Sequence, residues 1–302
     1  MVTISERVLS RGFLTIELEN DQIVVIVIPD KGAEIFDVRY KPKDNISLLY
    51  RSPWECRRNG SLIQVGNSWE KWLEHYFGGW QYMFPNAGQE CHVNGATHVF
   101  HGEASMTSWN YKFEQGATEG SLTCFTRLHR TPFYLEKKIT LRANESVLYV
   151  KDRVTNMGRE EVDYVWGQHV AFGAPFLDEN CRISLPNGKK PWIGIPPMDA
   201  SHASMDILDN LEEGVYTIVN DRLRMEVQLK WDASIFPYLW VWQEFGGSRG
   251  YPFYGAGYVL GLEPCSTATS EGLAASIEKG FSRRMVPLQT VESEIQMIVC
   301  EI

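Results

Sequence analysis

The stretch LEKKITLRANESVLYVKDRVTN, residues 135–156, shows the local pattern that decides the fold. Two runs rich in β-branched and aromatic residues, 135–141 and 147–154, are separated by the turn-forming residues Asn144, Glu145 and Ser146. Such runs bounded by turn residues are typical of antiparallel strands joined in hairpins. The same alternation of short apolar run and turn recurs along most of the chain and predicts an all-β protein.

Further strands follow from the same pattern. Residues 13–18 and 23–28 read as a hairpin followed by a strand at 35–40, and 135–141, 147–154 and 162–166 read as a three-stranded meander. Other strands are predicted at 122–128, 214–219, 224–229, 238–243, 258–263 and 292–300. With no repeat, low-complexity tract or linker, residues 1–302 are expected to form a single domain, a large β-sandwich of two packed, mostly antiparallel sheets.

Helical periodicity is confined to two short segments. In residues 68–76, Trp69, Trp72, Leu73 and Tyr76 fall on one helical face, and Asn67 can cap the N-terminus. A second helix is predicted over 273–279, ended by Gly280. The sandwich is therefore expected to carry one or two short helices.

Charge and composition narrow the class of partner. The formal net charge is -9, so the average field repels nucleic acid and anionic lipid surfaces. The first residues include charged Glu6, Arg7 and Arg11, and the aliphatic run 23–28 is too short to span a bilayer. The six cysteines are scattered without a paired motif, which favours reduced thiols in the cytoplasm. We expect a protein made without export that binds neither nucleic acid nor membrane.

Two ionisable residues follow glycines on strand-like segments. In WGQHVAFG (166–173), Gly167 and His169 share one face of an extended strand, whereas Trp166 and Gln168 share the other. In GYVLGLEPCS (257–266), Gly261 and Glu263 share a face in the same way. The pair could form the walls of one pocket. The alternative is a hydrogen-bonded core histidine and a solvated strand-end glutamate.

A third polar stretch is HVNGATHVFHGEAS, residues 92–105. His98 and His101 are three positions apart, which on a strand places them on opposite faces, so the three histidines of this stretch, with His92, do not predict a metal site. His101 directly precedes Gly102, which leaves room in front of it. Together with the 68–76 helix and the FGGWQYMFPNAG segment (77–88), this stretch is expected to cover one sheet surface.

These motifs, in this order, resemble the aldose 1-epimerase (galactose mutarotase-like) superfamily over roughly residues 10–300. The resemblance is carried by DKGAEIFDVRY (30–40), the glycine-rich segment with the following His-Gly pair, TLRANESVLYVKDRVTN (140–156), WGQHVAFGAPFL (166–177) and GLEP (261–264). It implies a β-supersandwich whose concave face binds a small-molecule sugar without a metal or organic cofactor. It further implies that His169 is the general acid, Glu263 the general base, and His101 a second histidine that holds and polarises the sugar ring.

The chain departs from that superfamily at two positions whose side chains usually bind sugar hydroxyl groups. The usual arginine before the His-Gly pair is missing, and Trp80, Gln81 and Asn86 stand in that region. The usual aspartate before the late glutamate is also missing, and the chain reads WVWQEF (240–245) there. Residues predicted to bind substrate are Trp80, Gln81, Asn86, Trp242 and Gln243, with Trp80, Trp242 and Phe172 as aromatic walls.

Anomer exchange needs one proton acceptor at the anomeric hydroxyl and one proton donor at the ring oxygen, which a carboxylate and an imidazolium can supply. This requires Glu263 and His169 in their charged forms together, which mutual attraction favours and burial opposes. Two other functions fit the same residues: a non-catalytic carbohydrate-binding or sensor protein, and an isomerase or epimerase acting beside the carbonyl carbon. A phosphosugar would need a cationic clamp, for which the candidates are Arg127, Arg130, Arg153 and Arg249.

Overall fold

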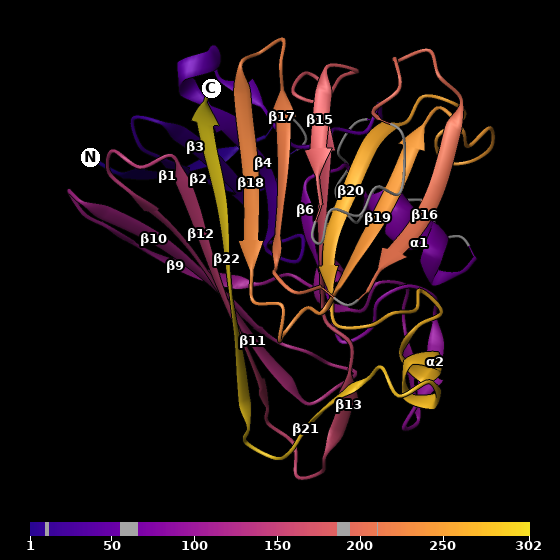
Figure 1. The fold of residues 1–302 in the computed structure, drawn as a ribbon. Coiled ribbons are helices and arrows are strands. Elements are labelled where there is room, and N and C mark those ends of the chain that lie inside the picture. Colours follow the sequence, from indigo (N-terminus) through magenta and orange to yellow (C-terminus); the bar gives the residue numbers. More distant parts are fainter. Residues whose placement is uncertain (10–11, 55–65, 186–193, 210) are drawn as a thin grey trace.

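The computed structural model describes residues 1–9, 12–54, 66–185, 194–209 and 211–302. Two antiparallel sheets make up most of it (Figure 1). The first has the order β1-β2-β3-β4-β6-β14-β20-β19-β16, with β5 paired to β4. Its strands are β1 (Thr3–Val8), β2 (Leu14–Glu19), β3 (Ile23–Ile28), β4 (Glu34–Tyr40), β5 (Ile46–Ser47), β6 (Trp80–Met83), β14 (Gly167–Gly173), β16 (His202–Leu208), β19 (Tyr238–Phe245) and β20 (Tyr258–Cys265).

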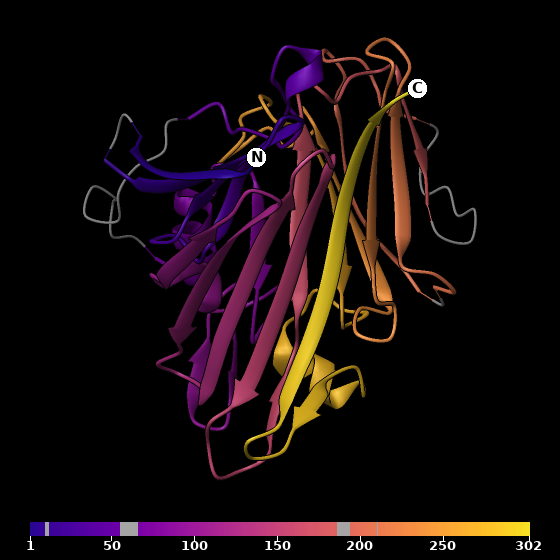
Figure 2. The same cartoon turned by 90° about the vertical axis from the view of Figure 1, so that its left-hand side faces the viewer.

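The second sheet has the order β15-β17-β18-β22-β12-β11-β10-β9. Figure 2 shows it with its C-terminal strand β22 in yellow, between the magenta and the orange strands. Its strands are β9 (Asn110–Gln115), β10 (Glu119–Arg127), β11 (Phe133–Arg142), β12 (Val147–Asn156), β15 (Cys181–Ser184), β17 (Val215–Asn220), β18 (Met225–Trp231) and β22 (Thr290–Glu301).

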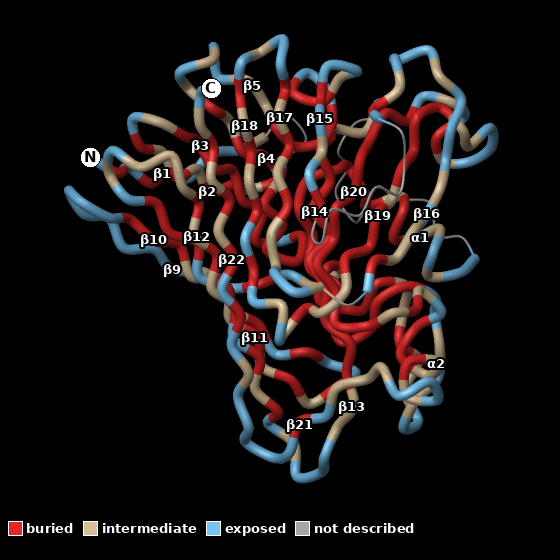
Figure 3. Tube along the Cα trace, viewed as in Figure 1, coloured by how far each residue is buried: buried red, intermediate tan, exposed pale blue. Residues whose placement is uncertain are grey.

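The two sheets pack through one shared hydrophobic core. Leu135 and Val150 of the second sheet belong to the same buried cluster as Val170 and Leu262 of the first. Figure 3 shows the buried segments of both sheets in red. Side chains alternate between the faces of each strand, so every second residue of these strands enters this core. The predicted all-β sandwich is confirmed.

One predicted connection is wrong. Residues 162–166 do not extend the meander of β11 and β12, because the other neighbour of β12 is β22, with Tyr149 opposite Gln296. β12 pairs with β22 over nine residues, which gives far more ladder hydrogen bonds than a pairing with the short strand β13 (Val162–Tyr164) could. β13 instead forms a separate two-stranded sheet with β21 (Arg283–Met285). The next strand, β14, starts at Gly167 and belongs to the first sheet.

Helix α1 (Ser68–His75) covers the face of the first sheet that is turned away from the core. Its start is capped as predicted, because the Asn67 side chain accepts a hydrogen bond from the backbone N–H of Glu70 at 2.9 Å. Trp72 and Leu73 are buried there in a second hydrophobic cluster with Ala171 of β14. A short helix α2 (Leu273–Glu278) and the hairpin of β7 (Cys91–Val93) and β8 (Ala96–His98) lie together at one end of the sheet.

Two further findings concern the whole of the described chain. No described helix is long and apolar enough to cross a membrane. Of the six cysteines, the five that the structure describes carry free thiols, and Cys56 lies outside the described residues.

Candidate active site

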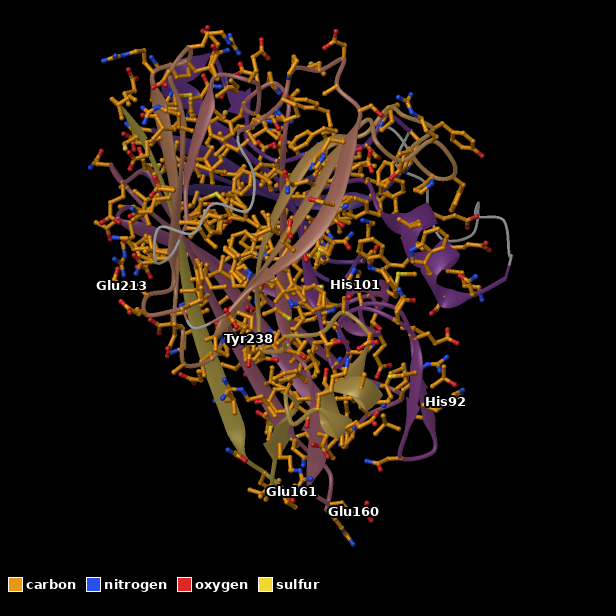
Figure 4. All side chains as sticks on the ribbon, turned by 45° about the vertical axis from the view of Figure 1, so that its right-hand side comes forward. His92, His101, Glu160, Glu161, Glu213 and Tyr238 are labelled. Atoms are coloured by element: carbon orange, nitrogen blue, oxygen red, sulfur yellow. The ribbon has the colours of Figure 1, made fainter. Side chains whose placement is uncertain are left out.

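A cavity of about 330 Å³ lies over the outer face of the first sheet, between strands β14, β19 and β20, helix α1 and the loop after β19. Its size is within the usual range for small-molecule sites. The lining residues include His101, His169, Trp242 and Glu263 from the sequence-based predictions. Figure 4 shows His101 close to α1, near the centre of the molecule.

Strand register places His169 beside Glu263. Strands β14 and β20 pair with Gly167 opposite Cys265 and Ala171 opposite Gly261, so His169 and Glu263, midway between, face each other across the ladder. His169 Nε2 lies 3.4 Å from Glu263 Oε1, and both side chains are almost fully buried. The fold therefore brings two titratable groups from distant parts of the sequence to one point of the cavity floor.

Gly261 makes room for the carboxylate. A Cβ atom at this position would lie 2.5 Å from Glu263 Oε1 and 3.2 Å from Cβ of Trp242, so any side chain would displace the carboxylate. The predicted gap beside Gly261 is thus occupied by Glu263 itself. The space beside Gly167 is filled instead by Met83 and Cys265, because a Cβ there would lie 2.5 Å from Met83 Cε.

Burial shifts both groups toward their neutral forms. It lowers the pKa of His169 to about 4 and raises the pKa of Glu263 well above its ordinary value. We expected an imidazolium and a carboxylate; burial favours neutral imidazole and carboxylic acid. The two forms differ only by the position of one proton, so in both the pair holds one proton donor and one proton acceptor.

The pair also has free hydrogen-bonding capacity. His169 Nδ1 and Glu263 Oε1 are buried and have no hydrogen-bond partner among the described residues. Buried polar atoms are nearly always hydrogen-bonded, so exceptions require an explanation. A ligand bound in the adjacent cavity would explain this exception, because it could supply the missing hydrogen bonds.

His101 has a fixed tautomer. Its Nδ1 accepts a hydrogen bond from the backbone N–H of Gly88 at 3.0 Å, and its own backbone N–H donates to the Gly88 carbonyl oxygen at 3.0 Å. Burial, and next the neighbouring His169, lower the pKa of His101 well below 6.5. His101 is therefore a neutral imidazole whose Nε2–H can donate, with its ring centroid 5.5 Å from that of His169.

Three predicted binding residues lie on the wrong face of the sheet for the cavity. Trp80 is opposite Val170, so it points into the core, where its Nε1–H donates to Gln168 Oε1 at 2.8 Å. Phe172 packs in the same core against Phe176. Gln243 lies next to cavity-lining Trp242 and therefore points the opposite way, with its Nε2 donating to Ser204 Oγ at 2.8 Å.

Gln81 and Asn86 also do not line the cavity. Gln81 is opposite His169 but its Nε2 donates to Glu34 Oε2 at 2.7 Å. Asn86 is fully buried and ties loops together: its Nδ2 donates to the carbonyl oxygens of Gln89 and Val99, each at 2.9 Å, and its Oδ1 accepts from Leu273 N–H at 2.6 Å. Asn86 thus supports the segment that carries His101.

Several cavity residues were not predicted as binding residues. Trp240 is opposite Glu263 in the β19–β20 pairing, and Met205 of β16 is opposite Trp242. The parity of Trp240 and Trp242 on one strand was visible in the sequence, but the pairing that places them beside Glu263 was not. The others come from α1, the loops and the β19–β20 connection: Trp69, Trp72, Leu73, Gly88, Gln89, Phe100, Ser248, Tyr251, Pro252, Phe253 and Ser270.

The remaining histidines of residues 92–105 lie elsewhere. His92 is on the outlying β7–β8 hairpin, away from His101 (Figure 4), where its Nδ1 contacts Thr97 Oγ1 at 3.2 Å. Within the described ranges, no three His, Cys, Asp or Glu side chains are grouped so that they could hold a metal ion.

The arginines considered for a phosphate clamp do not line the cavity. Arg153 pairs with Glu136 and Glu292 on the second sheet. Arg130 donates to the Thr97 carbonyl oxygen, and Arg249 donates to Ser201 Oγ.

Solved structures share this fold at low sequence identity. A candidate aldose 1-epimerase from Klebsiella pneumoniae is 16% identical with a TM-score of 0.80, over 99% of this chain and 84% of that one. The Slr1438 protein from Synechocystis is 15% identical with a TM-score of 0.74, over 98% and 97%. A galactose mutarotase-like protein from Clostridium acetobutylicum is 14% identical with a TM-score of 0.70, over 100% and 99%. The fold implied by the resemblance is therefore confirmed.

Comparison at the level of sequence gives a family without an assigned activity. No curated protein matches the chain significantly. The family described as "Domain of unknown function (DUF4432)" matches residues 10–194, more than half of the chain. The protein is therefore a member of the DUF4432 family, and it has the fold of the mutarotase-like proteins.

Proposed function

We propose that the protein interconverts the anomers of a reducing sugar at the His169–Glu263 pair. The observation that carries this proposal is the buried pair itself, with His169 Nε2 and Glu263 Oε1 at 3.4 Å on the floor of a sugar-sized cavity. The fold relatives include proteins described as candidate aldose 1-epimerases, which supports the same chemistry.

The chemistry requires one acceptor and one donor. The acceptor takes the proton of the anomeric hydroxyl while the donor protonates the ring oxygen, the bond from C1 to the ring oxygen breaks, and C1 becomes an aldehyde. After rotation about C1–C2, the ring hydroxyl attacks the other face of C1 and the two protons return. Glu263 as acceptor and His169 as donor, or the neutral pair with the roles exchanged, both complete this cycle without net proton uptake.

His101 would hold the sugar during the cycle. Its Nε2–H is a neutral donor fixed by the Gly88 contact, so it can bind a ring or hydroxyl oxygen without changing its own protonation. The flanking indoles of Trp72 and Trp242, with ring centroids 5.4 and 5.6 Å from that of His169, offer flat faces to the C–H bonds of a sugar.

Exchange NMR on a panel of reducing sugars tests the proposal. The protein should accelerate anomer exchange, Glu263→Gln should lower the enzymatic rate by about 10²- to 10⁴-fold, and Glu294→Gln, an exposed carboxylate on β22, should leave it unchanged. In heavy water, no deuterium should enter C–H positions, because only hydroxyl protons exchange in this reaction. Ligand binding without acceleration would instead establish a sugar-binding protein, and C–H deuteration would establish an isomerase.

A further inference from the structure

We infer that the cavity selects an uncharged reducing sugar with an apolar half, such as a deoxy or O-alkyl sugar, over fully hydroxylated or anionic sugars. This inference rests on the proposed function and concerns its substrate class. It comes from the unequal distribution of polar groups around the cavity.

One end of the cavity is polar. His169 and Glu263 lie on its floor, and His101 is held beside them by the backbone of Gly88. Ser270 lies next to this backbone, because its carbonyl oxygen accepts a hydrogen bond from Gln89 N–H at 2.9 Å. The anomeric carbon and ring oxygen of a sugar belong at this end, where the proton donor and acceptor are.

The walls beside and beyond these polar groups are apolar. They come from α1, β16, β19 and the loop after β19, and they are Trp69, Trp72, Leu73, Met205, Trp242, Tyr251, Pro252 and Phe253. Ring contacts join parts of these walls: the Trp69 and Tyr251 ring centroids are 6.0 Å apart, and those of Trp242 and Phe253 are 5.9 Å apart.

Two polar residues of the loop after β19, Tyr251 and Ser248, already use their donors within the protein. The Tyr251 hydroxyl donates to the Glu70 carbonyl oxygen at 3.3 Å, which joins the loop to α1. Ser248 donates from both its backbone N–H and its hydroxyl to the carboxylate of Glu244. A sugar hydroxyl directed at this end would lose water and gain few hydrogen bonds in return, which is unfavourable.

The described lining also lacks a cationic side chain that could bind an anionic sugar. Glu263 is the one Asp, Glu, Lys or Arg side chain among the described residues that line the cavity, so this lining offers no lysine or arginine to an anion. Two cations outside the lining have carboxylate neighbours: Lys31, buried in the turn between β3 and β4, pairs with Glu34, and the partly exposed Arg51 has its Nη2 3.2 Å from Asp37 Oδ2. A sugar phosphate or sugar acid would meet the Glu263 carboxyl group without a cationic partner from these walls.

Matched sugars test this selectivity. Exchange NMR would compare D-glucose and D-galactose with their 6-deoxy and 4-deoxy counterparts, their uronic acids and their 6-phosphates. Since a hydrophobic pocket distinguishes a missing hydroxyl or methylene by about 10- to 100-fold, kcat/KM for at least one deoxy sugar should exceed that of its parent by at least about tenfold. The anionic sugars should not be accelerated.

Two methionine variants test whether the apolar wall causes the preference for deoxy sugars. Met205→Gln adds hydrogen-bonding groups to the apolar wall at a side chain that is 42% exposed, so folding should tolerate it. It should reduce the preference for the deoxy sugar several-fold. Met198→Gln, at a methionine that is 64% exposed and outside the cavity lining, should leave the preference unchanged.

The outcomes separate the two proposals. Acceleration of the parent sugars or of the anionic sugars as strong as that of the deoxy sugars would overturn the inference and leave the mutarotase function standing. A deoxy preference that Met205→Gln does not reduce would also overturn it, because the discrimination would then come from another wall. No acceleration on any sugar would overturn the proposed function, and the inference with it.

Discussion

His169 and Glu263 are cross-strand neighbours on β14 and β20, with Nε2 and Oε1 at 3.4 Å and each side chain carrying a buried polar atom that lacks a partner within the described part of the chain. Such an arrangement costs stability in the free protein, because desolvated polar atoms without hydrogen bonds are unfavourable. The cost is understandable if a ligand supplies the missing hydrogen bonds. A substitution at this pair should therefore lower the activity without lowering the free energy of unfolding.

Glu263→Gln should lower the enzymatic rate, as proposed above, without destabilising the fold. The amide keeps the shape of the side chain and removes a carboxyl group that burial disfavours in its charged form, so the free energy of unfolding should stay the same or rise by about 1 kcal/mol. Urea denaturation followed by tryptophan fluorescence measures it, with Glu294→Gln as the control. A loss larger than about 2 kcal/mol would show that Glu263 has a structural role instead.

Gly261→Ala should impair catalysis by moving the carboxylate. The new Cβ would lie 2.5 Å from Glu263 Oε1, so the carboxyl group must shift away from His169. Because small misplacements of reacting groups are costly, we expect a loss of about tenfold to 10²-fold in kcat/KM. Gly194→Ala, at a glycine where no atom of the described residues lies within 4 Å of the added Cβ, is the matched control and should retain full activity. Equal activity of the two variants would contradict the role given to Gly261.

The pH dependence of the enzymatic rate should have two limbs. Below about pH 4, the pKa to which burial lowers His169, this imidazole takes up a proton while Glu263 keeps its own, so the acceptor is lost and the rate falls with decreasing pH. Above the raised pKa of Glu263, the pair loses its proton, so the donor is lost and the rate falls with increasing pH. Exchange rates corrected for the uncatalysed reaction would show both limbs, and an acid limb centred near the ordinary histidine pKa of about 6.5 would contradict the burial argument.

Local features of the fold could be predicted from the sequence. The strand Ile23–Ile28 has the predicted bounds, and Asn67 caps α1 as predicted, because both depend on neighbouring residues alone. The alternation rule also correctly separated His169 from Gln168, which lies on the core face and donates to Asp152 Oδ2 at 2.8 Å. Such features need no knowledge of which strands are neighbours.

Strand neighbours and register could not be predicted in this way. The sequence predicts Trp80 as an aromatic wall, but its pairing with Val170 places it in the core. The predicted meander includes residues 162–166, but β13 pairs with β21. Trp240 joins the cavity only because β19 pairs with β20 so that it faces Glu263. These relationships depend on contacts between segments far apart in the sequence, which local periodicity does not encode.

Removing one of two opposite charges that are buried near each other between the sheets should be destabilising. Lys137 and Asp152 are fully buried cross-strand partners on β11 and β12, and burial raises the pKa of Asp152 to about 6 despite the lysine. Lys137→Met removes the cation whose attraction lowers the pKa of this carboxyl group, and we expect a loss of about 1–3 kcal/mol in the free energy of unfolding. Lys138→Met, at the exposed neighbour on the same strand, should change it little. Recovery of most of the loss in the Lys137→Met, Asp152→Leu double variant would establish that the unpaired carboxyl group is the cause, and no recovery would contradict it.

Asn86→Ala should weaken both stability and the site, because Asn86 holds the His101 segment. The substitution removes two hydrogen bonds to carbonyl oxygens and one from Leu273 N–H, all of them in a buried position. We expect a loss of about 2–4 kcal/mol in the free energy of unfolding. Since Gly88, which fixes the His101 ring, belongs to the same loop, KM for the sugar should rise as well. Asn110→Ala, at an exposed asparagine of β9, is the control, and a variant as stable as this control would show that the loop is held by other contacts.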